Sequence, residues 1–274
     1  MPDLAARIEA LRADENAGLD EIRSTAEELL DRLEAGIVRA AERVDGEWIV
    51  NVWVKAGILL AFRAGRVMEF APAGPLHFSD KENLPPRRPP AGVRIVPGGS
   101  SARRGSFLGP NVVMMPPAYV NVGAYVGEGT MVDSHALVGS CAQIGSGVHL
   151  SAGAQIGGVL EPVGARPVIV EDEAFVGALA GAFEGVIVGR RAVLAAGVIL
   201  TARTPVHDLV RGEILRGTAA SPLVIPEGAV IVPGSRPASG EYARDLGLHL
   251  SAPMIVKYRD ASTEASTALE AALR

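Results

Sequence analysis

The sequence predicts a left-handed parallel β-helix of hexapeptide repeats, an all-β fold, with an N-terminal α-helical domain and a short C-terminal strand/helix extension. Aromatic residues make up only 4% of the chain while glycine contributes 32 residues, so the core must consist mainly of small and β-branched side chains. Steps of six residues then meet nine aliphatic residues without exception: Leu108, Met114, Val120, Val126, Val132, Val138, Ile144, Leu150 and Ile156. In such a coil each unit forms one side of a triangular prism, and its aliphatic side chain points inward.

The first third of the chain, residues 1–95, is expected to form a mainly helical domain that ends in a proline-rich linker. Apolar residues recur at helical spacing from Ile22 to Ile37, and again from Val54 to Phe62. Six prolines between positions 72 and 92 cannot sit inside a helix or a central strand. We therefore place the linker there.

The repeat is interrupted twice within the predicted coil, which spans residues 96–236. The six-residue register breaks near 157–169 and again near 204–224, and each time it resumes afterwards. Both interruptions should loop out of the coil, where functional residues often lie. Residues 237–274 form a C-terminal extension, with a strand near Met254 to Tyr258 and a helix after it, and we expect this extension to cover the open end of the coil.

Composition and charge narrow the function classes. A chain of 274 residues with 48% hydrophobic and 21% charged residues can bury a substantial core. The net charge is −5, and Lys and Arg do not gather into a run, which argues against nucleic acid as a partner. The chain has no stretch of about 18 apolar residues and no basic-then-apolar leader. We therefore expect no membrane partner and predict a cytoplasmic protein.

Cysteine and histidine usage argues against a metal site and a thiol nucleophile. The single Cys141 excludes a disulfide framework and a Cys-based zinc site, and its small-residue position in a repeat favours a buried, inert thiol. His135 and His149 lie fourteen residues apart, and no third histidine of the main coil completes a three-histidine zinc site. We therefore expect no metal. Either histidine as a general base is an alternative to the simpler interpretation of a hydrogen-bonded surface histidine.

Stretches within and outside the repeat carry a resemblance to a known family. The run from Ala118 to Pro162, the segments GVRIVP, LVIPEGAVIVPG and MIVKYRD, and the pair Glu184-Gly185 resemble those of the tetrahydrodipicolinate N-succinyltransferases. The N-terminal WVKAGILLAFR is also similar to that family's helical domain. The resemblance covers nearly the whole chain, and its most specific part surrounds residues 130–141.

The resemblance implies an acyltransferase of the diaminopimelate route to lysine. Such an enzyme transfers succinyl from succinyl-CoA to the nitrogen of tetrahydrodipicolinate, a cyclic imine dicarboxylate. Water adds and the ring opens, which gives N-succinyl-2-amino-6-oxopimelate. The resemblance further implies a homotrimer with active sites between subunits, in which the pantetheine arm of CoA lies along the prism, and a reaction that requires no metal.

Asp133 and Arg94 are the candidate residues for the acceptor substrate. An amine that attacks a thioester must lose a proton, so a carboxylate or a histidine has to lie within hydrogen-bond reach of the nitrogen. Asp133 follows the inward Val132 at a corner where most repeats have Gly or Asn, so its carboxylate should project from the coil; a turn-capping role is the alternative. By resemblance, Asp133 contacts the substrate nitrogen and Arg94 binds the substrate. A guanidinium suits a dicarboxylate, and a plain surface arginine is the alternative for Arg94.

Four residues are candidates for contact with CoA. They are Ala196, Gly197 and Thr201 in the late coils and Lys257 in the C-terminal extension. Backbone N–H groups stabilise a thioester oxygen as it gains charge, and such contacts leave little trace in a sequence.

One segment departs from the family pattern. Well-known members read Gly-Ala-Arg-Ser-Glu followed by a further Glu-Gly, and the first Glu is proposed as a second catalytic carboxylate. This chain has Leu179 in place of that Arg and Gly181 in place of that Glu, whereas Glu184 matches the later Glu and is our second catalytic candidate. We interpret the departure as a divergent branch with the same reaction. The alternatives are an N-acetyltransferase acting on the same or a related cyclic imine or amino acid, and a non-catalytic trimeric scaffold.

Overall fold

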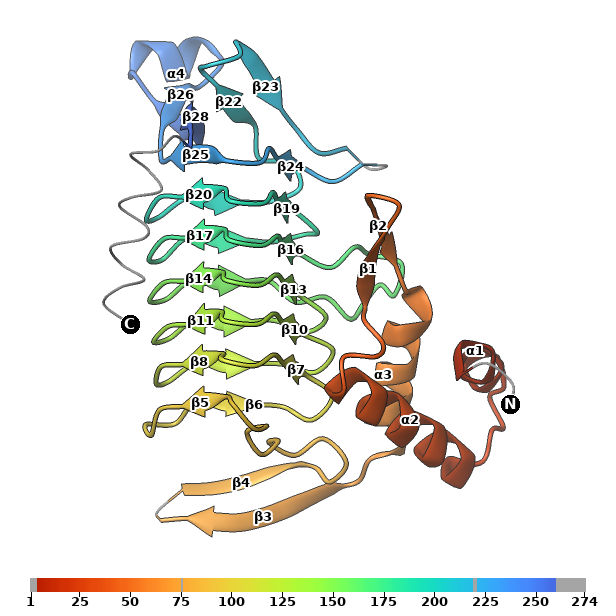
Figure 1. Cartoon of the computed structure of the whole chain (residues 1–274). Helices are drawn as coiled ribbons and strands as arrows, with labels where there is room; N and C mark the ends of the chain where they lie inside the picture. The colour runs from red at the N-terminus through yellow and green to blue at the C-terminus, as the bar shows by residue number, and fades with distance from the viewer. Residues whose placement is uncertain (1–3, 75, 219–220, 260–274) are drawn as a thin grey trace.

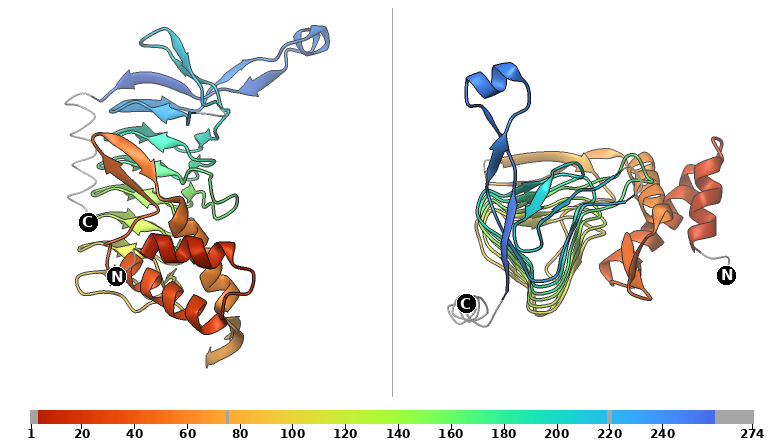
Figure 2. Two further views of the ribbon diagram at one scale, coloured as in Figure 1. Left: turned by 90° about the vertical axis from the view of Figure 1, so that its right-hand side faces the viewer. Right: turned by 90° about the horizontal axis from the view of Figure 1, so that it is seen from above.

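Three flat sheets enclose a triangular coil in the computed structural model, which describes residues 4–74, 76–218 and 221–259 (Figure 1). We call the sheets face I, face II and face III, in the order in which the chain visits them. Within the described ranges, face I has ten strands, and faces II and III have six each. Viewed along its axis, the coil keeps the same triangular outline from turn to turn (Figure 2).

Most strands of the coil are two residues long, and these short strands pair in parallel. Face I contains β5 (Arg94–Ile95), β8 (Val113–Met114), β11 (Met131–Val132), β14 (His149–Leu150), β17 (Phe175–Val176), β20 (Val193–Leu194), β25 (Ala229–Val232), β28 (Met254–Tyr258), β22 (Val206–Asp208) and β23 (Glu213–Leu215). Face II contains β6 (Ser101–Ala102), β9 (Tyr119–Val120), β12 (Leu137–Val138), β15 (Gln155–Ile156), β18 (Gly181–Ala182) and β21 (Ile199–Leu200). Face III contains β7 (Phe107–Leu108), β10 (Tyr125–Val126), β13 (Gln143–Ile144), β16 (Ile169–Val170), β19 (Ile187–Val188) and β24 (Val224–Ile225).

Small aliphatic side chains fill the prism, as the six-residue period predicts. All nine predicted inward residues are buried in one continuous core, so this prediction is confirmed. The register explains the packing, because pairs such as Val132 and Leu150 lie directly above one another on adjacent strands. An interior this narrow and close-packed leaves little room for aromatic rings, which accounts for the low aromatic content.

The corners between faces differ in what they carry. The I–II corner, which follows the strands of face I, consists of short turns at residues 133–135, 151–153, 177–179 and 195–197. The II–III corner follows the strands of face II, and both interruptions of the repeat start there, after β15 and after β21. Several corner residues have a left-handed backbone without being glycine, among them His135 (φ 62°), Cys141 (φ 66°) and Glu184 (φ 55°).

The helical domain covers face III and part of the II–III corner. It contains α1 (Leu4–Ala13), α2 (Leu19–Glu34), α3 (Val52–Ala64) and the hairpin of β1 (Ala41–Val44) and β2 (Glu47–Val50). Its apolar cluster continues into the coil, where Val122 and Cys141 join it. A second small cluster joins Ala41 to Ile169 and Ile187 of face III. The helical domain is therefore packed against the prism rather than tethered to it.

Four details differ from the sequence-based expectations. The expected linker contains a hairpin of β3 (Val67–Ala73) and β4 (Leu76–Lys81). An isolated two-stranded ribbon tolerates Pro72, because only a central strand would need the backbone N–H that proline lacks. The strand β5 lies within the range 1–95 assigned to the N-terminal domain, yet it pairs with β8 of the coil. The second interruption is no simple loop, since β22 and β23 form a hairpin that extends face I.

The fourth difference concerns the C-terminal extension. It contains β26 (Ser235–Pro237), α4 (Glu241–Asp245), β27 (His249–Ser251) and β28, and β28 is the strand predicted at Met254 to Tyr258. Rather than only covering an end, β28 inserts between β25 and β22 as part of face I. The helix expected after β28 lies outside the described residues. None of the helices in the described ranges is long and apolar enough to cross a membrane.

Candidate functional site

Asp133 projects from the I–II corner, directly after β11. Its Oδ1 accepts a hydrogen bond of 2.7 Å from the backbone N–H of Ser134, which is the turn-capping contact considered as an alternative. Its Oδ2 lies 3.9 Å from Nε2 of His149, and the Asp133 side chain is 29% exposed. One carboxylate oxygen therefore caps the turn while the carboxylate as a whole stays accessible at the edge of the prism.

Ala196 and Gly197 lie on the same corner as Asp133, three turns of the coil further along. The paired strands β11, β14, β17 and β20 connect the two positions, which places them about 14 Å apart at the usual strand spacing. Gly197 has a φ of 74°, a backbone conformation that favours glycine. The structure thus aligns Asp133 with two of the candidate CoA contacts along one edge.

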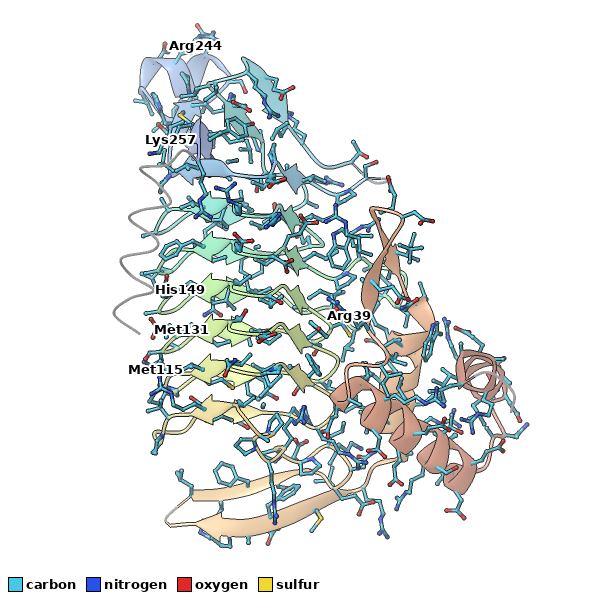
Figure 3. All side chains as sticks on the ribbon, in the orientation of Figure 1. Arg39, Met115, Met131, His149, Arg244 and Lys257 are labelled. Atoms are coloured by element: carbon cyan, nitrogen blue, oxygen red, sulfur yellow. The ribbon has the colours of Figure 1, made fainter. Side chains whose placement is uncertain are left out.

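Arg94 and Lys257 belong to the outer side of face I, toward its two ends. Arg94 on β5 is exposed and pairs with Val113, which pairs with Met131, so Arg94 lies about 10 Å from the strand that precedes Asp133. Lys257 on β28 is exposed and pairs with Val230 at the far end of the face. Figure 3 shows His149 directly above Met131 between these ends. Arg94 is therefore near Asp133, and Lys257 is not.

Glu184 and Thr201 lie together at the II–III corner, on a different edge of the prism from Asp133. The Oε2 of Glu184 accepts a hydrogen bond of 3.2 Å from the N–H of Ala202, the residue after Thr201. The backbone N–H of Thr201 donates to Oγ1 of Thr204 over 2.9 Å. Within one chain, the two candidate catalytic carboxylates therefore do not meet.

Non-repeat segments hold the turn of Glu184 in place. Lys55 of α3 is fully buried, and its Nζ donates to the carbonyl of Ala165 in the first interruption. Burial lowers the pKa of the Lys55 ammonium. The next residue, Arg166, donates from its guanidinium to the carbonyl of Trp48 over 3.2 Å, and its own carbonyl would lie 2.9 Å from a Cβ on Gly185. The helical domain thus contacts the first interruption, and the first interruption packs against the turn that contains Glu184.

The groove beside Glu184 is formed by the same segments. Its walls come from the β1–β2 hairpin, the first interruption and the late coils, and they include Trp48, Arg166, Glu184, Ala202 and Pro222. Arg166 supplies positive charge, and Glu184 negative charge, to the lining of the same groove. This groove could hold one end of a polar ligand, and it adds Arg166 to the residues that sequence reasoning singled out.

Phe183 occupies the space that a side chain on residue 181 would need. A Cβ on Gly181 would lie 2.5 Å from Cε2 of the Phe183 ring, and a Cβ on Gly157 of the preceding turn would lie 2.8 Å from Cδ1. Where the family resemblance implies a carboxylate, this chain therefore has an aromatic ring over two glycines. The nearest carboxylate along the chain is Glu184, on the corner that follows.

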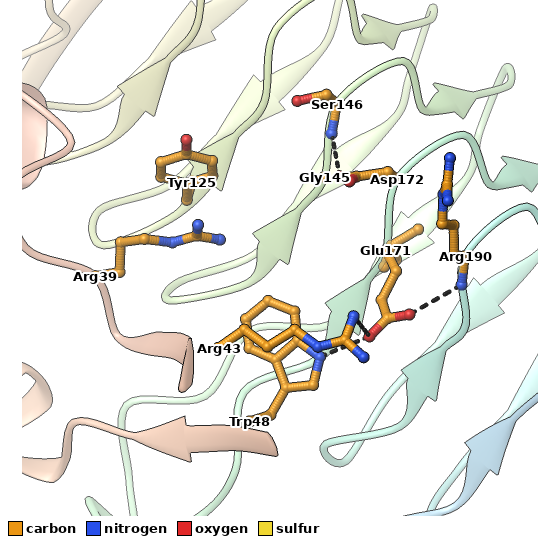
Figure 4. Close-up of a pocket in the computed structure, with 10 residues that line it drawn as sticks. Arg39, Arg43, Trp48, Tyr125, Gly145, Ser146, Glu171, Asp172 and Arg190 are labelled. Carbon is orange, nitrogen blue, oxygen red and sulfur yellow. Dashed lines mark hydrogen bonds and ion pairs between the residues drawn. The ribbon is translucent and has the colours of Figure 1, made fainter. Parts of the chain in front are cut away.

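A second pocket between the β1–β2 hairpin and face III was not predicted (Figure 4). The Arg39 guanidinium lies 3.7 Å from the centre of the Tyr125 ring and donates to Oε1 of Gln143 over 2.9 Å. Burial lowers the pKa of Arg39. Trp48 donates from Nε1 to Glu171 over 2.7 Å. No repeat or motif signals this pocket, because its walls come from segments that are far apart in the sequence.

Comparison with known proteins places these features in a family context. Residues 3–64 match the family model described as "Tetrahydrodipicolinate N-succinyltransferase N-terminal", and residues 167–202 match "Hexapeptide repeat of succinyl-transferase". The chain is similar to three proteins described as 2,3,4,5-tetrahydropyridine-2,6-dicarboxylate N-succinyltransferase. For that of Azoarcus sp. (strain BH72), identity is 47% over 92% of this chain and 90% of the relative. For that of Aromatoleum aromaticum, identity is 46% over 92% of this chain and 90% of the relative. For that of Polynucleobacter asymbioticus, identity is 48% over 93% of this chain and 90% of the relative.

Proposed function

The chain belongs to the tetrahydrodipicolinate N-succinyltransferase family, and from this premise we propose that its I–II and II–III corners supply the two halves of an active site between chains. The reaction is transfer of succinyl from succinyl-CoA to the nitrogen of tetrahydrodipicolinate, in the diaminopimelate route to lysine. The observation that carries the proposal for the site is the Asp133 carboxylate, which is held by Ser134 yet accessible at the prism edge.

The chemistry assigns Asp133 the proton transfer. Hydration of the cyclic imine gives a nitrogen that carries a proton and a lone pair. That lone pair attacks the carbonyl carbon of the thioester, the carbon–sulfur bond breaks, and CoA leaves as its thiolate. The Asp133 carboxylate accepts the proton that the nitrogen loses, and ring opening then yields N-succinyl-2-amino-6-oxopimelate. An ionised carboxylate offers about four lone-pair directions, so the contact with Ser134 leaves others for this proton.

Arg94 is proposed to bind a carboxylate of the acceptor. The Arg94 side chain is exposed on the outer side of face I, and its backbone lies about 10 Å from the strand before Asp133. A long side chain and a dicarboxylate can bridge this separation together. A planar guanidinium binds a carboxylate with two parallel hydrogen bonds, which orients the acceptor as well as attracting it.

The separation of the two carboxylates supports an assembly of several chains. Asp133 follows β11 of face I and Glu184 follows β18 of face II, so the width of face II separates the two carboxylates within one chain. A closed ring of three copies would place the I–II corner of one chain against the II–III corner of the next. We therefore propose a homotrimer in which Asp133 of one subunit and Glu184 of its neighbour face the same acceptor.

The proposed CoA contacts follow the same division between corners. Ala196 and Gly197 lie on the I–II corner, Thr201 on the II–III corner, and Lys257 at the end of face I. Charge supports this location, because residues 186–259 contain nine Lys and Arg against five Asp and Glu, whereas residues 1–185 contain sixteen against twenty-three. The late part of the chain is thus the cationic part, which suits the phosphates of CoA. The cytoplasmic location stays a prediction.

The proposed function is tested by CoA release from the purified protein. Succinyl-CoA and acetyl-CoA are each supplied with and without tetrahydrodipicolinate, with Asp133→Asn as the matched inactive variant. We expect release that requires tetrahydrodipicolinate, prefers succinyl-CoA and is lost in the variant. Release with acetyl-CoA alone would move the function to acetyl transfer. Absence of release with both donors would contradict the proposal.

A further inference from the structure

His149 is placed beside Asp133 by the register of the coil. It begins β14 directly above Met131 of β11, and Asp133 is the second residue after Met131. The distance from His149 Nε2 to Asp133 Oδ2 is 3.9 Å, and the histidine side chain is only 9% exposed. The ring also packs against Phe175 of the next strand, with 5.0 Å between ring centres. Its position is therefore fixed by packing above and below.

We propose that His149 is a positioning residue for Asp133. This inference rests on the proposed role of Asp133 in the transfer. Ser134 holds Oδ1 through its backbone N–H, and Nε2 of His149 lies 3.9 Å from Oδ2, beyond hydrogen-bond distance, where an N–H on that nitrogen would attract the carboxylate electrostatically. The hydrogen bond on Oδ1 and the histidine ring beside Oδ2 together restrict how the carboxylate can turn. The lone pairs that remain then point in a defined direction, toward the position from which the substrate nitrogen approaches.

The structure separates the two histidines that sequence reasoning left open as general bases. His135 lies two residues after Asp133 in the same turn, but its side chain is exposed, and its φ is 62°. His149 is nearly buried, and its Nε2 lies 3.9 Å from the carboxylate rather than at an open surface. A role through Asp133 therefore fits His149 better than direct contact with substrate.

The experiment compares steady-state kinetics of His149→Phe and His149→Gln with those of the unmodified protein. Phenylalanine keeps the packing on Phe175 but presents no nitrogen, whereas glutamine keeps a donor at similar reach. We expect His149→Phe to lower kcat by about 10²-fold with KM for tetrahydrodipicolinate changed much less, and His149→Gln to recover most of the loss. His135→Asn is the matched control, since asparagine tolerates the left-handed backbone, and it should leave kcat unchanged.

A double variant decides whether His149 acts through Asp133. If it does, Asp133→Asn combined with His149→Phe should be no slower than Asp133→Asn alone, because the carboxylate to be positioned is already gone. Additive losses, or full activity of His149→Phe beside an inactive Asp133→Asn, would overturn the inference and leave the proposed function intact. Absence of turnover in the unmodified protein would overturn both. Should His149→Phe not fold, His149→Asn replaces it, because its shorter amide cannot reach Oδ2 and the same loss of kcat is expected.

Discussion

The two corners that carry Asp133 and Glu184 are built from the same six-residue repeat, yet their surroundings differ. In the described part of the chain, the Asp133 side chain contacts residues of the coil, Ser134 and His149. The Glu184 turn instead packs on Arg166 of an interruption that α3 holds through Lys55. The repeat thus sets where a backbone turn lies, while segments outside the repeat decide whether that turn is an open edge or the wall of a groove.

The largest effect is expected at the I–II corner, which carries Asp133. Asp133→Asn should lower kcat/KM by about 10²- to 10⁴-fold, because the proton acceptor is lost. Thermal unfolding should change little, since the asparagine oxygen can still accept the N–H of Ser134. Activity and melting temperature are measured on the same preparation. A parallel loss of stability would assign Asp133 to turn capping alone.

A smaller loss is expected at the II–III corner, which carries Glu184. Glu184→Gln should lower kcat by about 10²-fold, because the charge disappears while an oxygen remains for the N–H of Ala202. Glu173→Gln is the control, since Glu173 is a half-exposed carboxylate paired with Arg190 at another corner. Equal activity of both variants would remove Glu184 from the catalytic residues and leave Asp133 as the sole carboxylate.

The ring over Gly181 leads to a stability prediction. Gly181→Glu should destabilise the fold by about 1–3 kcal/mol in urea unfolding, because the new Cβ overlaps the Phe183 ring. Replacing Phe183 by Ala in the same chain should relieve that overlap, so that the double variant is more stable than the sum of the single changes predicts. A Gly181→Glu protein as stable as the unmodified chain would show that the ring moves aside freely.

The smallest effect concerns Cys141, which lies on the II–III corner beneath the helical domain. Burial raises the pKa of its thiol to about 12, so the folded protein should react slowly with thiol reagents and the unfolded chain rapidly. The unfolded thiol loses its proton first, near its ordinary pKa of 9.0, so this group makes the fold less stable as pH rises from there toward about 12. Rapid labelling of the folded protein would contradict the burial.

Much of the coil could be predicted from the sequence because every inward position repeats one chemical requirement. Val132 and Leu150 are aliphatic for the same reason, and their spacing alone identifies the strand direction and the prism. The corner position of Asp133 follows from the same spacing. The hairpin around Pro72 could not be predicted, because a proline is compatible with both a linker and an edge strand.

The contacts around the site depended on pairs that the repeat does not encode. His149 meets Asp133 only because one turn of the coil lies on the next, and Lys55 meets Ala165 across 110 positions of sequence. The Phe183 ring likewise packs over Gly181, and neither residue occupies one of the inward positions that the repeat specifies. Periodicity finds the scaffold, whereas neighbours on different segments become visible only in three dimensions.

Mixing two inactive variants tests the central claim most directly, that Asp133 and Glu184 serve one site from different chains. Asp133→Asn and Glu184→Gln, carrying different tags, are co-expressed, and assemblies that contain both are isolated and assayed for succinyl-CoA-dependent CoA release. In each trimer that contains both variants, one site of the three combines an intact Asp133 with an intact Glu184 from the neighbour, so about a third of the unmodified activity should return. Mixed assemblies no more active than the two separate variants would contradict the claim.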